Sequence, residues 1–119
     1  MKENVIKNKS FAFALRTVKM YQFLCEQKKE FVMSKQLLRS GTAVGALVRE
    51  AEQAESPADF IHKMAIALKE ANETEYWIEL LFQSNYIDET SFNSIKSDLT
   101  EILKLLISII KTAKQNIKK

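Results

Sequence analysis

Two glutamates near the middle of the chain are the side chains best placed to do chemistry. Glu70 lies within an otherwise apolar helical arc, and Glu73 follows it by one turn. A buried charge is costly unless it is paired, so we interpret Glu70 as ion-paired with Lys63, Arg39 or Arg49. Two other roles stay open for Glu70, namely a general base in a cleft and an ion pair with another subunit. The predicted structural polar core comprises Glu70, Glu73, Arg39 and Glu50.

The single cysteine and the single histidine do not make a convincing catalytic pair. Nucleophilic catalysis needs a nucleophile, a base and an orienting group. Cys25 lies on an apolar stripe, where cysteine usually acts as a small hydrophobe. Asp59 and His62 form one carboxylate-x-x-His pair, whereas a di-iron bundle site needs two Glu-x-x-His motifs. We therefore predict no catalytic residue, no metal and no cofactor, and keep an enzyme using Glu70 or Glu73 as a rival hypothesis.

A row of basic side chains is suited to binding phosphate. At about 100° per residue, five lysines of the last predicted helix fall within an arc of roughly 80°, opposite its apolar arc. No aromatic residue interrupts this arc, which favours backbone recognition of folded or double-stranded nucleic acid over stacking of single strands. The alternative is a solvated basic face that only keeps the protein in solution. The predicted nucleic-acid-binding residues are Lys96, Lys104, Lys111, Lys114 and Lys118, extended by Lys9, Arg16 and Lys19 of the first helix.

The distribution of charge agrees with that prediction but has a second interpretation. Residues 1–35 carry 8 basic and 3 acidic side chains, residues 36–103 carry 5 and 12, and residues 104–119 carry 5 and none. Basic ends are typical of contact with nucleic acid or an acidic partner. They could equally pair with the acidic middle once the helices pack side by side.

Composition points to long helices that hold these residues in place. The 119 residues include only 2 Gly and 1 Pro, fewer than β folds or alternating α/β folds need for their turns. A hydrophobic content of 46% excludes a disordered chain. No apolar run approaches the length of a membrane span, and the N-terminus lacks the features of a signal peptide. With one cysteine and no possible internal disulfide, we expect a cytoplasmic protein with no membrane contact.

Apolar periodicity predicts four helices over about residues 10–28, 34–55, 57–84 and 89–116. Ser34 and Ser56 are expected N-caps, with Pro57 at the first helical position of the third helix. Asn85 is an expected C-terminal stop, and Asp88 or Thr90 an expected cap of the fourth helix. The prediction is a single all-α domain over residues 1–119, folded as an antiparallel up-and-down four-helix bundle.

The first two helices have more apolar or small surface than one bundle should cover. Phe11 and Leu15 belong to the stripe that we assign to the core, with Ala14, Val18, Tyr21 and Cys25. A second apolar line lies roughly opposite it, and the outer face of the second helix is rich in small residues. Large exposed apolar patches mark interfaces, which predicts a homo-oligomer. The predicted oligomer interface consists of Phe13, Met20, Leu24, Ala43 and Leu47.

Two segments together resemble a known family. They are residues 35–51, KQLLRSGTAVGALVREA, and residues 59–81, DFIHKMAIALKEANETEYWIELL. They resemble the bacterial four-helix-bundle proteins encoded in intervening sequences of 23S ribosomal RNA genes, over nearly the whole chain. The residues that match the family pattern are Arg39, Ser40, Gly41, Gly45, Glu50, Ala51, Asp59, Phe60, Glu70, Glu73 and Trp77. The sequence departs from it at Leu47, where the family usually has Asn, and at Arg49, where it has a small residue.

The resemblance implies an assembly and a class of partner, not a reaction. The family is similar to the accessory bundle protein of diversity-generating retroelements, which implies a ring-shaped homopentamer that binds nucleic acid and a reverse transcriptase. We therefore expect a non-enzymatic oligomeric scaffold, likewise pentameric, for structured RNA or DNA, with no small-molecule substrate. The alternative is a protein-binding adaptor without nucleic-acid affinity.

Overall fold

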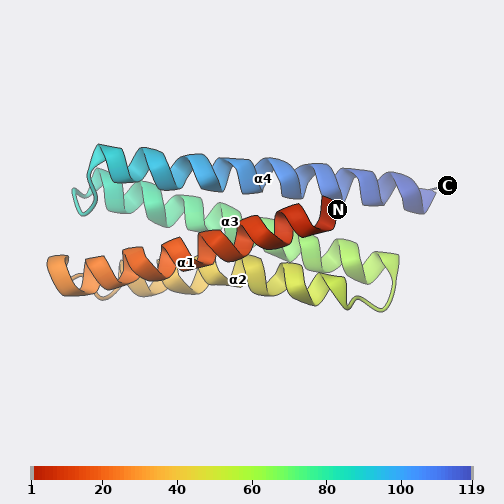
Figure 1. The fold of residues 1–119 in the computed structure, drawn as a ribbon, viewed down its shortest axis with the longest axis horizontal. Helices are drawn as coiled ribbons and strands as arrows, with labels where there is room; N and C mark the ends of the chain where they lie inside the picture. The colour runs from red at the N-terminus through yellow and green to blue at the C-terminus, as the bar shows by residue number, and fades with distance from the viewer. Residues whose placement is uncertain (1, 119) are drawn as a thin grey trace.

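The computed structural model describes residues 2–118, with the side chains of residues 5–118. These residues fold into four helices (Figure 1). Helix α1 spans Lys2–Lys28, α2 spans Met33–Glu52, α3 spans Pro57–Gln83 and α4 spans Glu89–Lys118. Consecutive helices run antiparallel and form an up-and-down bundle of 51 × 22 × 21 Å, so the predicted fold class is confirmed. No helix in this part of the chain is long and apolar enough to cross a membrane.

The caps of α3 and α4 are those that the sequence predicts. The Ser56 hydroxyl accepts the backbone N–H of Asp59 at 3.0 Å, directly before Pro57. Asn85 adopts a positive φ of 67° and ends α3. The Asp88 carboxylate accepts the Ser91 N–H at 2.7 Å at the start of α4, which lowers the pKa of Asp88. These polar side chains satisfy backbone groups that a helix end leaves unpaired.

The starts of α1 and α2 differ from the prediction. Ser10 does not begin α1, because it lies inside the helix, is buried and donates its hydroxyl to the Lys7 carbonyl at 3.2 Å. Ser34 is not the N-cap of α2. Instead the buried Glu30 carboxylate accepts the N–H groups of Val32, Met33 and Ser34, at 3.2, 3.1 and 2.7 Å. The positive end of the helix dipole also stabilises a carboxylate at this position.

The core takes the opposite face of α1 from the one predicted. Phe13 and Leu24 are 1% and 0% exposed, whereas Phe11 and Leu15 are 49% and 51% exposed. The physical reason is the earlier start of α1, which adds the buried Ile6 to the line of Phe13 and Leu24 at helical spacing. The line of Phe13, extended by Ile6, is the face that the bundle covers.

Close packing of α1 on α2 explains the two glycines of the chain. A Cβ added to Gly41 would lie 2.7 Å from both Cγ2 and Oγ1 of Thr17, which is fully buried. A Cβ on Gly45 would lie 3.3 Å from the carbonyl oxygen of Ser10. The glycines thus lower the helix propensity of α2 but allow the backbone of α1 to approach.

Candidate nucleic-acid interface

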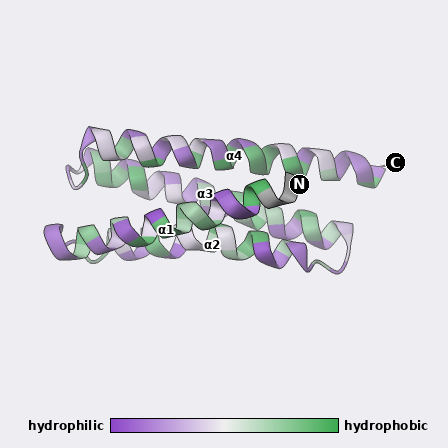
Figure 2. Cartoon of the chain, in the orientation of Figure 1, coloured by the Kyte–Doolittle hydropathy of each residue, from purple (hydrophilic) through white to green (hydrophobic). Residues whose placement is uncertain are grey.

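The C-terminal half of α4 carries an uncompensated row of positive charge. Residues 104–118 contain four lysines and no acidic residue, and all four lysines are exposed. None has a carboxylate within 4.0 Å among the described side chains. In Figure 2 purple, hydrophilic segments prevail in the last turns of α4. We name Lys104, Lys111, Lys114 and Lys118 the lysine ridge.

Three of the other predicted phosphate ligands are engaged elsewhere. Lys96 lies 3.0 Å from Glu79 and 3.7 Å from Glu75, and the Glu79 hydrogen bond raises its pKa. Lys9 pairs with Glu101 at 2.8 Å and Arg16 with Asp98 at 2.5 Å. Carboxylates of α3 and α4 thus already pair with all three, and their binding to nucleic acid stays a prediction. Lys19 is exposed, without such a partner in the described region.

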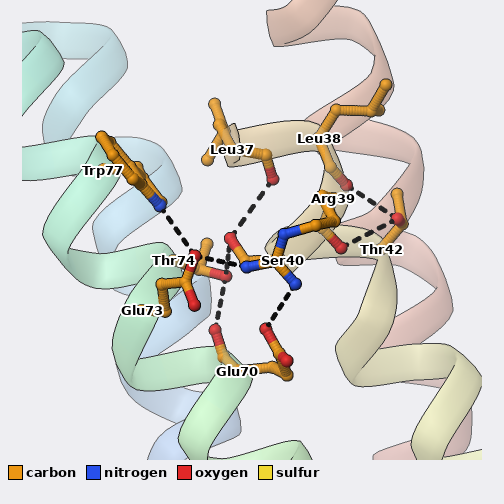
Figure 3. A network of polar contacts seen from close by, with 9 residues as sticks. All are labelled: Leu37, Leu38, Arg39, Ser40, Thr42, Glu70, Glu73, Thr74 and Trp77. Carbon is orange, nitrogen blue, oxygen red and sulfur yellow. Dashed lines mark hydrogen bonds and ion pairs between the residues drawn. The ribbon is translucent and has the colours of Figure 1, made fainter. Parts of the chain in front are cut away.

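The predicted pairing of Glu70 is found within the chain. Figure 3 shows Arg39 of α2 lying between Glu70 and Glu73 of α3. The Arg39 Nη1 atom donates to Glu70 at 3.2 Å, and its Nη2 atom donates to Glu73. Only 17% of the Glu70 side chain is exposed, against 50% of Arg39. The pair therefore joins α2 to α3 at the edge of the core rather than deep inside it.

Glu50 is not part of this polar network. Its carboxylate lies 3.3 Å from Lys63, and 56% of its side chain is exposed. Glu50 and Arg39 lie about three turns apart on α2, so they pair with different residues of α3. Glu50 is thus a surface residue rather than a member of the polar core.

The network includes partners that the sequence analysis did not identify. The Trp77 indole N–H donates to Glu73 at 3.0 Å, one turn along α3 (Figure 3). Beneath the ion pairs, the fully buried hydroxyls of Thr74 and Ser40 lie 2.9 Å apart. Two features of the sequence indicate these contacts. Glu73 and Trp77 are spaced i, i+4 on one helix, and Ser40 lies on the core face of α2.

The electrostatics of the network do not provide a base. The Trp77 N–H bond, followed by the Arg39 hydrogen bond, lowers the pKa of Glu73. Both interactions stabilise the carboxylate, whereas a general base at neutral pH needs a raised pKa. The arrangement therefore stabilises the ionised form of Glu73.

The remaining reactive groups are also separate from one another. Cys25 is half-buried on α1, with its Sγ atom 3.7 Å from the Ser34 hydroxyl, while His62 is exposed on α3. Among the described residues no three His, Cys, Asp or Glu side chains are grouped as metal ligands. The geometry therefore offers a structural polar network and a basic surface as its chemical features.

The surface available for self-association differs from the predicted one. Phe13 and Leu24 are wrong as interface residues, because the core of their own chain buries them. Met20, Ala43 and Leu47 are half-buried. The apolar side chains that the bundle does leave exposed on α1 include Phe11 and Leu15, with the Arg49 guanidinium carbon 5.0 Å from the Phe11 ring centroid.

The fold and its polar network define a class of all-α four-helix-bundle proteins, and the sequence places the chain within one family of that class. The model of the 23S rRNA-intervening sequence protein family matches residues 2–108. The chain therefore belongs to this family, as its helix-two and helix-three segments predicted.

A solved structure agrees with the family assignment. A Bacteroides thetaiotaomicron protein of unknown function, from the S23 ribosomal protein family, is 65% identical to this chain, with a TM-score of 0.92. The match covers 93% of this chain and 99% of the other. None of the curated proteins matches the chain.

Proposed function

We propose that this protein is a non-enzymatic scaffold that binds structured nucleic acid through α4. The observation that carries the proposal is the lysine ridge, whose ammonium groups are exposed and have no carboxylate partner among the described residues. Basic side chains that neutralise phosphates provide most of the affinity of sequence-independent nucleic-acid binding. The membership of the 23S rRNA-intervening sequence protein family supports this proposal and favours RNA.

The ridge suits recognition of a backbone rather than of bases. The phosphates of a folded nucleic acid form rows that lysines on one face of a straight helix can follow. Lys104, Lys111 and Lys118 repeat every seven residues, so they lie along one line of α4 about 10 Å apart. We expect binding with little sequence specificity and a strong dependence on salt.

Charge reversal tests the proposal. A triple variant of the ridge should lose binding to a folded RNA in a gel-shift assay at low salt. Its substitutions are Lys104→Glu, Lys111→Glu and Lys114→Glu. A matched reversal at three other exposed lysines, Lys29, Lys35 and Lys69, should retain binding. The proposal fails if wild-type protein does not bind folded RNA or duplex DNA at low salt, or if the α4 variant binds as well as wild type.

Self-association would increase the effect of the ridge. We infer a homo-oligomer, with a pentamer as the expected size from the family resemblance, assembled through the exposed face of α1 that carries Phe11 and Leu15. Each is about half exposed, which is unusual for large apolar side chains four residues apart on one helix. Several copies of a weak phosphate-binding ridge would add by multivalency. Light scattering that gives a mass of 13.7 kDa at micromolar concentration would contradict this assembly.

The same exposed face supports the second candidate function, a protein-binding adaptor without nucleic-acid affinity. Phe11 and Leu15 could receive a different protein instead of a second copy. The gel-shift assay separates the two functions, since an adaptor would not bind RNA at low salt. With one half-buried cysteine on α1, we propose that either function operates in the cytoplasm.

A further inference from the structure

A surface groove lies between the C-terminal half of α1 and the first turns of α4. It consists of two adjoining hollows of about 350 and 260 Å³, and Phe23 and Ser91 line both. Met20, Phe23 and Ile95 contribute the apolar lining of the first hollow, and Tyr86 and Ile87 that of the second. This α1–α4 groove belongs to neither the lysine ridge nor the Arg39 network.

The groove exists because α1 approaches α4 closely only along its N-terminal half (Figure 1). Lys9 and Arg16 reach across to α4, and after Arg16 no described hydrogen bond or ion pair joins the two helices. The ring of Phe23 is therefore 41% exposed, although it lies beside core residues. An aromatic face is thus available to a ligand at the point where the two helices separate.

The two walls of the groove have different chemistry. On the α1 side, Lys19 and Lys28 are exposed. The Lys28 ammonium lies over one face of the Phe23 ring, 5.9 Å from its centroid, so a base would stack on the other face. On the other side, Asn85 and Ser91 add uncharged polar groups. Asp88 also lines this wall, but its carboxylate already accepts the backbone N–H of Ser91 at 2.7 Å. An anion would meet two lysines on one wall. The other wall offers hydrogen-bonding groups beside the Asp88 carboxylate, whose negative charge Lys28 partly offsets.

We propose that the α1–α4 groove binds an unpaired RNA nucleotide, with its base stacked on Phe23 and its phosphates beside Lys19 and Lys28. The proposal rests on the proposed function, because the lysine ridge would hold the folded part of the same RNA. A base stacks on an aromatic face whatever its identity, and a ribose 2′-hydroxyl can pair with groups such as those of Asn85 and Ser91.

The size of the apolar lining favours a nucleotide over an acidic peptide helix. A docked helix needs apolar contacts repeated over two or three turns, that is, over roughly 10–16 Å. Met20 and Phe23 span only one turn of α1, and Ile95 adds one contact from α4. Tyr86 and Ile87, between α3 and α4, line only the second hollow and do not lengthen the row of apolar contacts along α1. A single planar base matches that area, and its phosphates match the lysines.

Fluorescence anisotropy with two labelled RNA hairpins tests the proposal. One hairpin is blunt, and the other carries a four-nucleotide single-stranded 3′ overhang. We expect the overhang to tighten binding by roughly tenfold, the order expected for stacking of one base. Phe23→Ala should abolish this gain without changing the affinity for the blunt hairpin. Tyr76→Ala removes an aromatic ring of comparable exposure, 58%, on α3 and should retain the gain.

The outcomes separate this site from the proposed function. A blunt hairpin that binds with no gain from the overhang overturns the groove and leaves the ridge intact. If neither hairpin binds, both proposals fail. An equal gain from a DNA overhang would contradict the assignment to RNA. Should Phe23→Ala not fold, Lys19→Glu with Lys28→Glu provides the second test, since it must also abolish the gain.

Discussion

The two sides of α2 and the seam between α1 and α4 are stabilised by different means. Against α1, α2 brings Gly41 into contact with the buried Thr17, and against α3 it buries the Ser40–Thr74 hydroxyl pair. Between α1 and α4, the described polar links come from Lys9 and Arg16 at the surface.

The difference shows that an ion pair contributes according to its burial. Glu70, the acidic partner of Arg39, is 17% exposed, whereas Asp98 and Glu101 of the α1–α4 seam are 48% and 55% exposed. Water and salt screen the exposed pairs, so they add little stability. We therefore expect the contacts of α2 with α1 and α3 to contribute more to stability than the ion pairs between α1 and α4.

The largest expected loss of stability follows from crowding the α1–α2 contact. Gly41→Ala should lower the free energy of unfolding by about 2 kcal/mol, because overpacking outweighs the gain in helix propensity. In a Thr17→Ala background, which removes both atoms that lie 2.7 Å from the added Cβ, the loss should largely disappear. Urea denaturation of the four proteins measures this coupling. Equal losses in both backgrounds would show that the close approach does not explain this glycine.

A smaller loss is expected from the α2–α3 ion pairs. Arg39→Met should cost about 1 kcal/mol, more than a fully exposed pair and less than the 3–5 kcal/mol of a buried one. The substitution leaves the largely buried Glu70 carboxylate without the Arg39 guanidinium that pairs with it. Thermal melting of Arg39→Met beside Lys35→Met, an exposed residue of the same helix, measures the effect. A melting temperature equal to that of wild type would mean that the network does not contribute to the stability of the fold.

The fold was more predictable from the sequence than the site. Local signals fixed the ends of α3, because Ser56, Pro57 and Asn85 act on their own backbone. The buried face of α1 depended on Ile6, outside the predicted helix, and on the small residues that let α1 approach α2. Periodicity finds two apolar lines on a helix but not which of them a neighbour covers.

The basic surface was the harder prediction because charge pairing depends on the register between helices. Lys9 and Glu101 are 92 residues apart in the sequence, and only the packed bundle brings them to 2.8 Å. The lysine ridge stays a free surface because no acidic residue lies among residues 104–118. Among the described side chains no carboxylate lies within 4.0 Å of its ammonium groups, although Glu101 precedes Lys104 by one turn. The α1–α4 groove could not be anticipated, since it arises from the angle between two helices.

The pH dependence of stability gives a finer test of the α2–α3 network. A lowered pKa for Glu73 means that its contribution is present above the ordinary pKa of glutamate, and is lost as the pH falls through the lowered value. Wild type should therefore exceed Glu73→Gln in melting temperature at pH 7. The difference should start to shrink as the pH falls below the ordinary glutamate pKa of about 4.3 and vanish below the lowered pKa of Glu73. A constant difference between the two proteins across this range would assign the effect to something other than the ionised carboxylate.

The smallest expected effect comes from the loose seam. Arg16→Met should cost less than about 0.5 kcal/mol at low salt, and the cost should vanish in 1 M salt, where exposed pairs are screened. Urea denaturation at both salt concentrations measures it. A loss comparable to that of Arg39→Met would remove the distinction between the two regions.

The central claim is that the lysine ridge is the free phosphate-binding surface. The salt dependence of RNA binding tests this claim most directly. The measurement is the slope of log Kd against log salt concentration for a duplex RNA. Three proteins are compared: wild type, the triple ridge variant Lys104→Gln, Lys111→Gln, Lys114→Gln, and Arg16→Gln as the control between α1 and α4. Each lost phosphate contact reduces the slope by about 0.9 in B-DNA, so the ridge variant should lose roughly 2–3 units, while Arg16→Gln keeps the wild-type slope. An unchanged slope in the ridge variant, or an equal reduction in Arg16→Gln, would contradict the claim.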